Sequence, residues 1–259
     1  MTNAETAMLN KVPTVTIGFW IIKIMSTTVG ETGADYLAVH VGLGTAVTGV
    51  VMATLLLAAL LLQLRAKTYV PSIYWLTVVL VSVVGTQITD ALTDGLEISL
   101  YLSTAVFAVL LAAIFALWFA VEGTLSIHTI VTRRRELFYW AAILCTFALG
   151  TAAGDLATEA LNLGFTLGLA MFGLLIGAIA AAWYFSLNAV LAFWLAYILT
   201  RPLGASFGDL LSQSQANGGF GLGTIATSAV FLVVISILVL CLSISQSWPP
   251  VAMPPADHG

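Results

Sequence analysis

The chain has 259 residues, of which 60% are hydrophobic and only 8% are charged, and its mean hydropathy is +1.06. A soluble domain carries roughly a quarter charged residues, so this composition leaves no room for a soluble catalytic domain and predicts no nucleic-acid partner. It predicts an all-α polytopic membrane protein. The formal net charge of −4 is small, and the placement of the charges is more informative than their sum.

Eight apolar segments, each long enough for a helix of about twenty residues to cross a bilayer, follow one another along the chain. We place them at residues 14–37, 43–64, 71–94, 99–122, 136–160, 163–186, 188–212 and 222–245. Residues 1–13 form a tail before them, and no signal-peptide cleavage pattern is evident, so we expect the first segment to be a retained anchor. The proline-rich tail at residues 246–259 is expected to be disordered.

A motif of fixed spacing occurs in the first, third, fifth and seventh segments. Each copy has an aromatic residue and a tryptophan, then a glycine ten residues after the tryptophan and an aspartate five residues after the glycine. The copies are Phe19, Trp20, Gly30 and Asp35; Tyr74, Trp75, Gly85 and Asp90; Tyr139, Trp140, Gly150 and Asp155; and Phe193, Trp194, Gly204 and Asp209. Four identical spacings indicate a fourfold internal repeat.

Each repeat contains a motif segment followed by a more uniformly apolar segment, at approximately 14–66, 71–127, 136–187 and 188–245. Two segments return the chain to the side from which it started, so all four copies enter the membrane in the same direction. We therefore predict eight transmembrane helices in four parallel helical-hairpin repeats, with the motif helices central and the others outside against lipid. A pairwise arrangement of two halves is the alternative.

The basic residues of the connections fall on one side of the predicted membrane, together with the N-terminus. They are Lys11, Arg65, Lys67, Arg133, Arg134 and Arg135. The opposite connections contain no Lys or Arg. Because cytoplasmic loops carry the excess of Lys and Arg, both termini are predicted to be cytoplasmic.

The tryptophans and glycines of the motif each allow two interpretations. The tryptophans can form an aromatic belt at the membrane interface, or they can belong to the motif's own function. The glycines are more typical of close helix packing, because small residues let helices approach. Their alternative is a local unwinding that exposes backbone carbonyls to a ligand.

The motif aspartates lie within apolar segments, where carboxylates are costly and usually mark a pathway or a binding site. Further acids accompany them, and pairs four residues apart share one face of a helix. We predict one metal site made by Asp35, Asp90, Asp155, Asp209, Glu31, Asp94 and Glu159. So many like charges repel unless a cation or protons neutralise them, and carboxylates suit Mg²⁺, Ca²⁺ or Mn²⁺. The alternative places the aspartates as caps just beyond the membrane.

Two cationic residues interrupt the motif helices. Lys23 follows Trp20 by one turn, and its side chain either extends toward the cytoplasm or takes a gating role. Arg201 lies mid-segment beside Pro202, which can kink a helix. We hypothesise that Arg201 compensates charge by pairing with an acid of the cluster, and that a bound cation displaces it.

The repeat pattern resembles a bacterial inner-membrane family described as four tandem repeats of unknown function, with two membrane spans and a tryptophan in each repeat. The resemblance covers about Lys11 to Ser245 and implies an eight-helix protein of the bacterial inner (plasma) membrane, with no established substrate. The segment Gly30–Asp35 is also similar to the Glu-x-Gly-Asp signature of membrane cation/proton exchangers for Ca²⁺ and Mn²⁺. Here Ala34 separates Gly33 from the aspartate, and the other three copies lack the glutamate.

Together these patterns favour a secondary transporter or exporter of a divalent metal cation, with Mn²⁺ the first choice. The motif aspartates would bind the ion, and protons would be exchanged because clustered carboxylates titrate together. The alternatives are a passive channel with an acidic ring and a non-transporting scaffold or sensor. No nucleophile–base pair or nucleotide motif is present, so neither an enzyme nor a bound cofactor is expected. The expected partners are the lipid bilayer, the metal cation and protons, and a homo-oligomer is left open.

Overall fold

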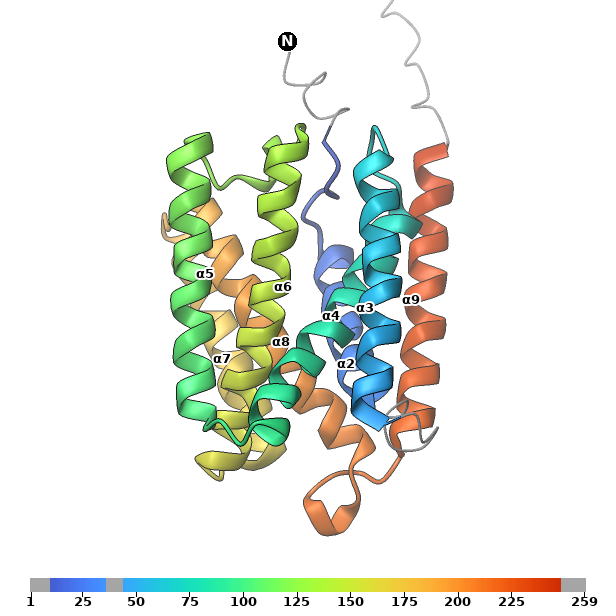
Figure 1. Cartoon of the computed structure of the whole chain (residues 1–259), viewed down its shortest axis with the longest axis vertical. Coiled ribbons are helices and arrows are strands. Elements are labelled where there is room, and N and C mark those ends of the chain that lie inside the picture. The colour runs from blue at the N-terminus through green and yellow to red at the C-terminus, as the bar shows by residue number, and fades with distance from the viewer. Residues whose placement is uncertain (1–9, 36–43, 248–259) are drawn as a thin grey trace, which may run out of the picture.

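The described structure consists of helices. In the computed structural model, residues 10–35 and 44–247 are described, and within them the chain forms eight long helices and no strand (Figure 1). The motif lies on α2 (Ile17–Asp35), α4 (Pro71–Asp90), α6 (Arg133–Asp155) and α8 (Ala189–Ser212). The helices that follow them are α3 (Gly44–Arg65), α5 (Leu100–Glu122), α7 (Gly164–Tyr184) and α9 (Thr224–Ser247). The predicted all-α fold is confirmed for this part of the chain.

Most of these helices are suited to a bilayer. Seven of the described helices are long and apolar enough to cross a membrane, and Ile17–Gly30 of α2 is a shorter apolar stretch. Helices satisfy their own backbone polar groups, which hydrocarbon requires. Their starts are fixed locally: Pro71 begins α4, and the side chains of Ser99, Thr132 and Asn188 accept hydrogen bonds from the first backbone N–H groups of α5, α6 and α8. The chain is a multi-pass membrane protein.

The motif helices form the interior of the bundle. Helix α2 packs against α4 and α8, and α6 also packs against α4 and α8, so the four make a ring. In the apolar stretches of α4, α6 and α8, 61%, 72% and 56% of the residues are buried, whereas the four following helices reach 17% at most. Within the described residues the motif helices therefore contact one another in a cycle, and α4, α6 and α8 are far more buried than the helices that follow the motif helices.

The outer helices do not pack mainly within their own repeats. Helix α3 packs on α4, α5 on α6, and α7 on α8, so each outer helix contacts the inner helix of the following repeat. Helix α9 of the last repeat packs on α2 of the first. The expected hairpins are thus consecutive in sequence, but their packing interlocks one repeat with the next and closes into a cycle.

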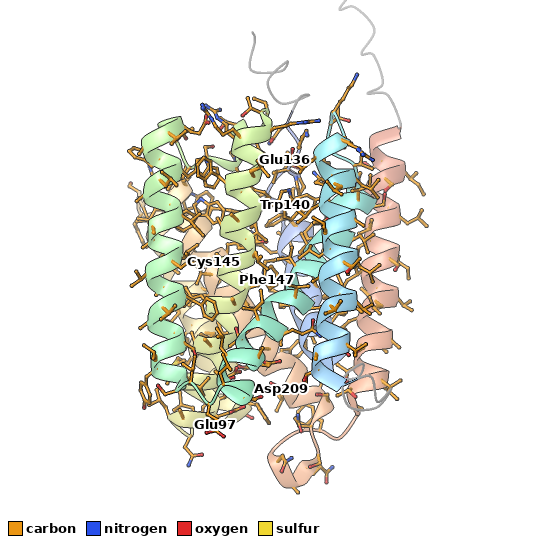
Figure 2. The ribbon with its side chains drawn as sticks, viewed as in Figure 1. Glu97, Glu136, Trp140, Cys145, Phe147 and Asp209 are labelled. Atoms are coloured by element: carbon orange, nitrogen blue, oxygen red, sulfur yellow. The ribbon has the colours of Figure 1, made fainter. Side chains whose placement is uncertain are left out.

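The two ends of the bundle differ in charge. The basic end carries the starts of α4, α6 and α8 and the residues Lys11, Arg65, Lys67, Arg133, Arg134 and Arg135. The acidic end includes two turns of π-helix, η2 (Ala91–Gly95) and η4 (Leu156–Ala160), which directly follow the motif aspartates of α4 and α6. Figure 2 shows Glu136 near one end of α6, and Glu97 and Asp209 at the opposite end of the bundle. Two short 3₁₀ turns, η3 (Ile127–Thr129) and η5 (Gln215–Asn217), lie in connections.

Candidate functional site

An aromatic layer joins the four repeats near the basic end. The aromatic residue that precedes each motif tryptophan contacts the tryptophan of the next repeat, and the fourth repeat contacts the first. The ring centroids are 5.5 Å apart in Phe19–Trp75, 5.5 Å in Tyr74–Trp140, 6.2 Å in Tyr139–Trp194 and 5.7 Å in Phe193–Trp20. Three of these tryptophans are buried: Trp75, Trp140 and Trp194. They fill the interior of the bundle, so the interfacial-belt interpretation is wrong for them.

A glycine layer follows deeper in the bundle and obeys the same cyclic rule. A Cβ atom on each motif glycine would collide with the side chain seven residues after the tryptophan of the next repeat. The distances are 1.8 Å from Gly30 to Ser82 Oγ, 2.6 Å from Gly85 to Phe147 Cβ, 2.5 Å from Gly150 to Arg201 Cβ and 1.7 Å from Gly204 to Thr27 Oγ1. All four glycines lie within regular helix. They serve close packing, as predicted, and do not unwind the helix.

Hydroxyl groups connect neighbouring inner helices at the same depth. Thr28 Oγ1 donates to the carbonyl of Gly204 at 2.9 Å, and Thr89 Oγ1 donates to the carbonyl of Ala148 at 3.0 Å. Each hydroxyl can donate to a carbonyl of the neighbouring helix because a small residue brings the two backbones close together. These contacts were missed from sequence, although the frequent Thr and Ser on the motif helices were a visible signal.

Lys23 points into the interior. It is 1% exposed, and its Nζ lies 4.0 Å from the ring centroid of Phe147 and 4.3 Å from that of Tyr197. No side-chain or backbone atom in the described residues accepts a hydrogen bond from this Nζ. Aromatic faces attract a cation at such distances, which explains the orientation. The interpretation that Lys23 extends to the membrane interface is therefore wrong.

Arg201 lies one layer deeper and is fully buried. Its hydrogen bonds include those that Nη2 donates to the hydroxyls of Thr86 and Thr151. These threonines directly follow the motif glycines of α4 and α6, and the corresponding position on α2 is Glu31. Arg201 thus reaches from α8 to two other inner helices. Helix α8 continues through Pro202.

The predicted metal ligands lie at the acidic end, as far as they are described. Asp90 and Asp155 are the last residues of α4 and α6, Asp209 is three residues from the end of α8, and all three are half-buried. Each interacts with at least one other group, and so does Glu159 of η4. Asp94 of η2 and Glu159 are exposed.

The seven-acid metal site stays a prediction. The side chains of Glu31 and Asp35 lie outside the described residues. Among the side chains that are described, no three from His, Cys, Asp and Glu lie close enough together to hold a metal ion. The described acids therefore do not make the site by themselves.

An apolar groove of about 860 Å³ lies apart from the acids, between α2, α7 and α8. Trp20, Ile176, Trp183 and Phe193 contribute to its lining, and His128 is the one ionisable side chain among its described lining residues. A hydrated metal ion would find no carboxylate there. The groove suits apolar chains and adds nothing to the predicted cation site.

The fourfold repeat matches a known protein family along most of its length. Four segments of the chain, residues 18–69, 73–124, 138–187 and 192–247, match the family described as Repeat of Unknown Function (DUF347). No curated protein and no solved structure gives a significant match. The matched segments agree with the predicted repeats, and each contains one motif helix and the outer helix that follows it. The chain therefore belongs to the DUF347 repeat family, with four tandem copies of the repeat.

Proposed function

We propose that the protein is a secondary transporter that moves a divalent metal cation along the axis of its four parallel repeats, in exchange for protons. The observation that carries the proposal is the burial of Lys23 and Arg201 between the inner helices. Charged groups in the interior of a membrane protein are expensive and usually serve a pathway or a binding site. In our proposal the protein lies in a bacterial inner membrane, with its basic end in the cytoplasm.

The distribution of charge supports a controlled passage of cations. Half-buried aspartates on three inner helices, Asp90, Asp155 and Asp209, make the acidic end attractive to cations. Lys23 of α2 and Arg201 of α8 lie farther toward the basic end and repel a cation that has entered. An ion would pass this barrier only when the positive charges are displaced or neutralised. Such a barrier fits coupled exchange.

The roles of the individual groups follow from this arrangement. The four motif aspartates would hold the metal, with Glu31, Asp94 and Glu159 taking protons or supporting the ligands. Carboxylate oxygens favour hard cations such as Mn²⁺, Ca²⁺ and Mg²⁺, and Mn²⁺ is our first choice. Arg201 would compensate the acids when no metal is bound, and Lys23 would gate the axis.

A passive channel fits the packing less well, because the aromatic layer and the rings around Lys23 fill the inner bundle near the basic end. A non-transporting scaffold or sensor is the second candidate. The interlocked glycine layer favours it, since contacts this close hold helices together whatever the protein does. The two candidates differ in whether removal of the carboxylates changes metal flux.

The test is metal uptake into proteoliposomes under an imposed pH gradient. Wild-type protein is compared with the variant in which Asp35, Asp90, Asp155 and Asp209 are all changed to Asn, across Mn²⁺, Ca²⁺ and Mg²⁺. We expect saturable, gradient-dependent Mn²⁺ flux in the wild type and none in the variant. Glu97→Gln is the matched control, because Glu97 is exposed at the acidic end but lies outside the motif. Equal flux in the wild type and a folded quadruple variant would remove the transport proposal.

A further inference from the structure

A short N-terminal segment, Asn10–Val12, is buried at the basic end, and we call it the strap. Lys11 is 8% exposed and Val12 is 5% exposed. Figure 1 shows the chain descending from this segment between α6 and α3 to α2. An extended segment without a helix of its own must find other partners for its backbone groups. Those partners identify what the strap holds together.

The strap is bonded on two sides. On one side the backbone N–H of Lys11 donates to the carbonyl of Ile130 at 3.2 Å, and Asn10 Nδ2 donates to the carbonyl of Ile127 at 3.1 Å. On the other side Gln63 Nε2, near the end of α3, donates to the carbonyl of Lys11 at 3.4 Å. The strap therefore links the α5–α6 connection to α3.

These anchors place the strap across the end of the inner helices. The α5–α6 connection is held to α8, because the carbonyl of Leu125 accepts a hydrogen bond from Trp194 Nε1 at 3.0 Å. Helix α3 packs on α4. The strap runs from the side of α6 and α8 to the side of α3 and α4, and Val12 packs into the same core as the aromatic layer.

One buried ion pair fastens the strap. Lys11 Nζ lies 2.6 Å from Glu136 Oε2, and it also donates to the carbonyl of Leu64 at 3.3 Å. Glu136 is 1% exposed and is labelled near the end of α6 in Figure 2. A pair like this is favourable only while both charges stay together in good geometry, since separation inside the protein leaves a buried charge without a partner. The pair is therefore expected to stay closed unless both charges reach water.

The ion pair breaks the fourfold symmetry of the repeat. Glu136 lies four residues before its motif tryptophan, and the corresponding residues are Thr16, Pro71 and Val190. Helix α2 also begins only three residues before Trp20, whereas α4, α6 and α8 begin four, seven and five residues before theirs. Because α2 begins later, the strap occupies the position at the basic end that the first turn fills in the other inner helices. Repeat packing alone therefore does not require this contact.

We propose that the strap is the gate at the basic end of the axis and that the Lys11–Glu136 ion pair is its latch. Release of the pair frees the strap and opens the aromatic layer beneath it to water. The inference rests on the proposed transport pathway, but it assigns a moving part and a controlling contact that the transport proposal does not need.

Two cysteine probes test the gate in full-length protein in lipid nanodiscs, after Cys145→Ala and Cys241→Ser. Val12→Cys reports departure of the strap, and Val78→Cys, fully buried on α4 at the repeat position of Lys23, reports opening of the axis. Both are labelled with a charged, water-soluble thiol reagent. In Lys11→Met or Glu136→Gln backgrounds we expect both to label at least roughly tenfold faster, because the broken buried pair favours local opening. The exchanged pair, Lys11→Glu with Glu136→Lys, should restore slow labelling.

Arg134→Gln is the matched control, because Arg134 pairs with Glu122 at the same end without touching the strap. It should leave both labelling rates unchanged. If only Val12→Cys is labelled faster, the strap is a tether and not a gate. Unchanged rates at both probes would show that the Lys11–Glu136 pair does not hold the strap in place. A third probe, Ala152→Cys, is fully buried toward the acidic end. A parallel rise there would show general loosening and would equally contradict a local gate.

The labelling needs no transported ion. Absence of Mn²⁺ flux together with latch-dependent labelling at both probes would refute the proposed function and leave the gate standing. Metal flux without latch-dependent labelling would support the proposed function and refute the gate.

Discussion

The inner and outer helices of this protein reverse the usual relation between polarity and burial. Helices α4, α6 and α8 have a lower mean hydropathy than any outer helix, yet far more of their residues are buried. In water the most apolar helix would be the most buried. In a bilayer the apolar helices face lipid, so the interior is available for hydroxyls, glycines and the two cations Lys23 and Arg201. The inner helices thus hold the close contacts and the buried cations, and the outer helices are left to face lipid.

The largest predicted difference in stability between the two kinds of helix follows from substituting a glycine. Gly204→Val should cost about 3 kcal/mol of stability or more, because overpacking of this kind leaves no room for repacking. The new Cβ would lie 1.7 Å from Thr27 Oγ1 and 3.0 Å from the backbone carbonyl oxygen of Ile24. Gly177→Val on α7 is the control, since nothing lies within 4 Å of its added Cβ. Thermal unfolding in detergent measures both variants, and a similar stability in the two would contradict the glycine layer.

Arg201 gives the next largest effect. Arg201→Ala should cost about 2–4 kcal/mol, because it opens a cavity and removes the donor of Thr86 and Thr151. We also expect it to abolish Mn²⁺ flux, whereas Arg201→Lys should keep part of the flux because it keeps the positive charge. The outer-helix control is Leu174→Ala, since Leu174 is 75% exposed. Full flux in Arg201→Ala would exclude the charge-compensating role.

The sequence predicts which helices are the inner ones better than it predicts which neighbours the outer helices contact. The motif spacing gives the repeats, and the motif helices can be recognised as central because Lys23, Arg201 and the aspartates interrupt only them. The docking of α3 on α4, and of each later outer helix on the next repeat, does not follow from a period. A repeat length fixes what recurs, but it does not fix which neighbour a helix contacts.

The direction in which side chains point was the second feature that the sequence could not predict. Lys23 is long enough to reach an interface or to remain inside, and only the positions of the Phe147 and Tyr197 rings decide between them. Glu136 carried no repeat signal, because no other copy has an acid at its position. The aspartates were identified by their spacing. Their predicted convergence depends on Glu31 and Asp35, whose side chains lie outside the described residues.

Lys23 should change stability in the opposite direction to Arg201. Lys23→Met keeps much of the side-chain volume and removes a buried charge that has no hydrogen-bond acceptor in the described structure. Replacing buried charge by apolar groups is often stabilising, so we expect a gain of about 1–2 kcal/mol. Metal flux should nevertheless be lost, because Lys23 gates the axis in our proposal. A less stable variant with normal flux would mean that Lys23 serves packing through its ring contacts.

The smallest effect lies at the border between an outer and an inner helix. Tyr69, in the connection from α3 to α4, accepts a hydrogen bond from Trp75 Nε1 at 3.1 Å, and burial raises its pKa to about 12. Because the folded chain holds this proton more tightly than the unfolded chain, the resulting stability is present below pH 10 and is lost as the pH rises from about 10 to about 12. Tyr69→Phe should cost about 1 kcal/mol at neutral pH, since Trp75 loses its acceptor, and it should make the alkaline decline smaller. Denaturant unfolding of both proteins at pH 7 and pH 11 measures the two effects. An equal alkaline decline in the variant would assign that decline to other groups.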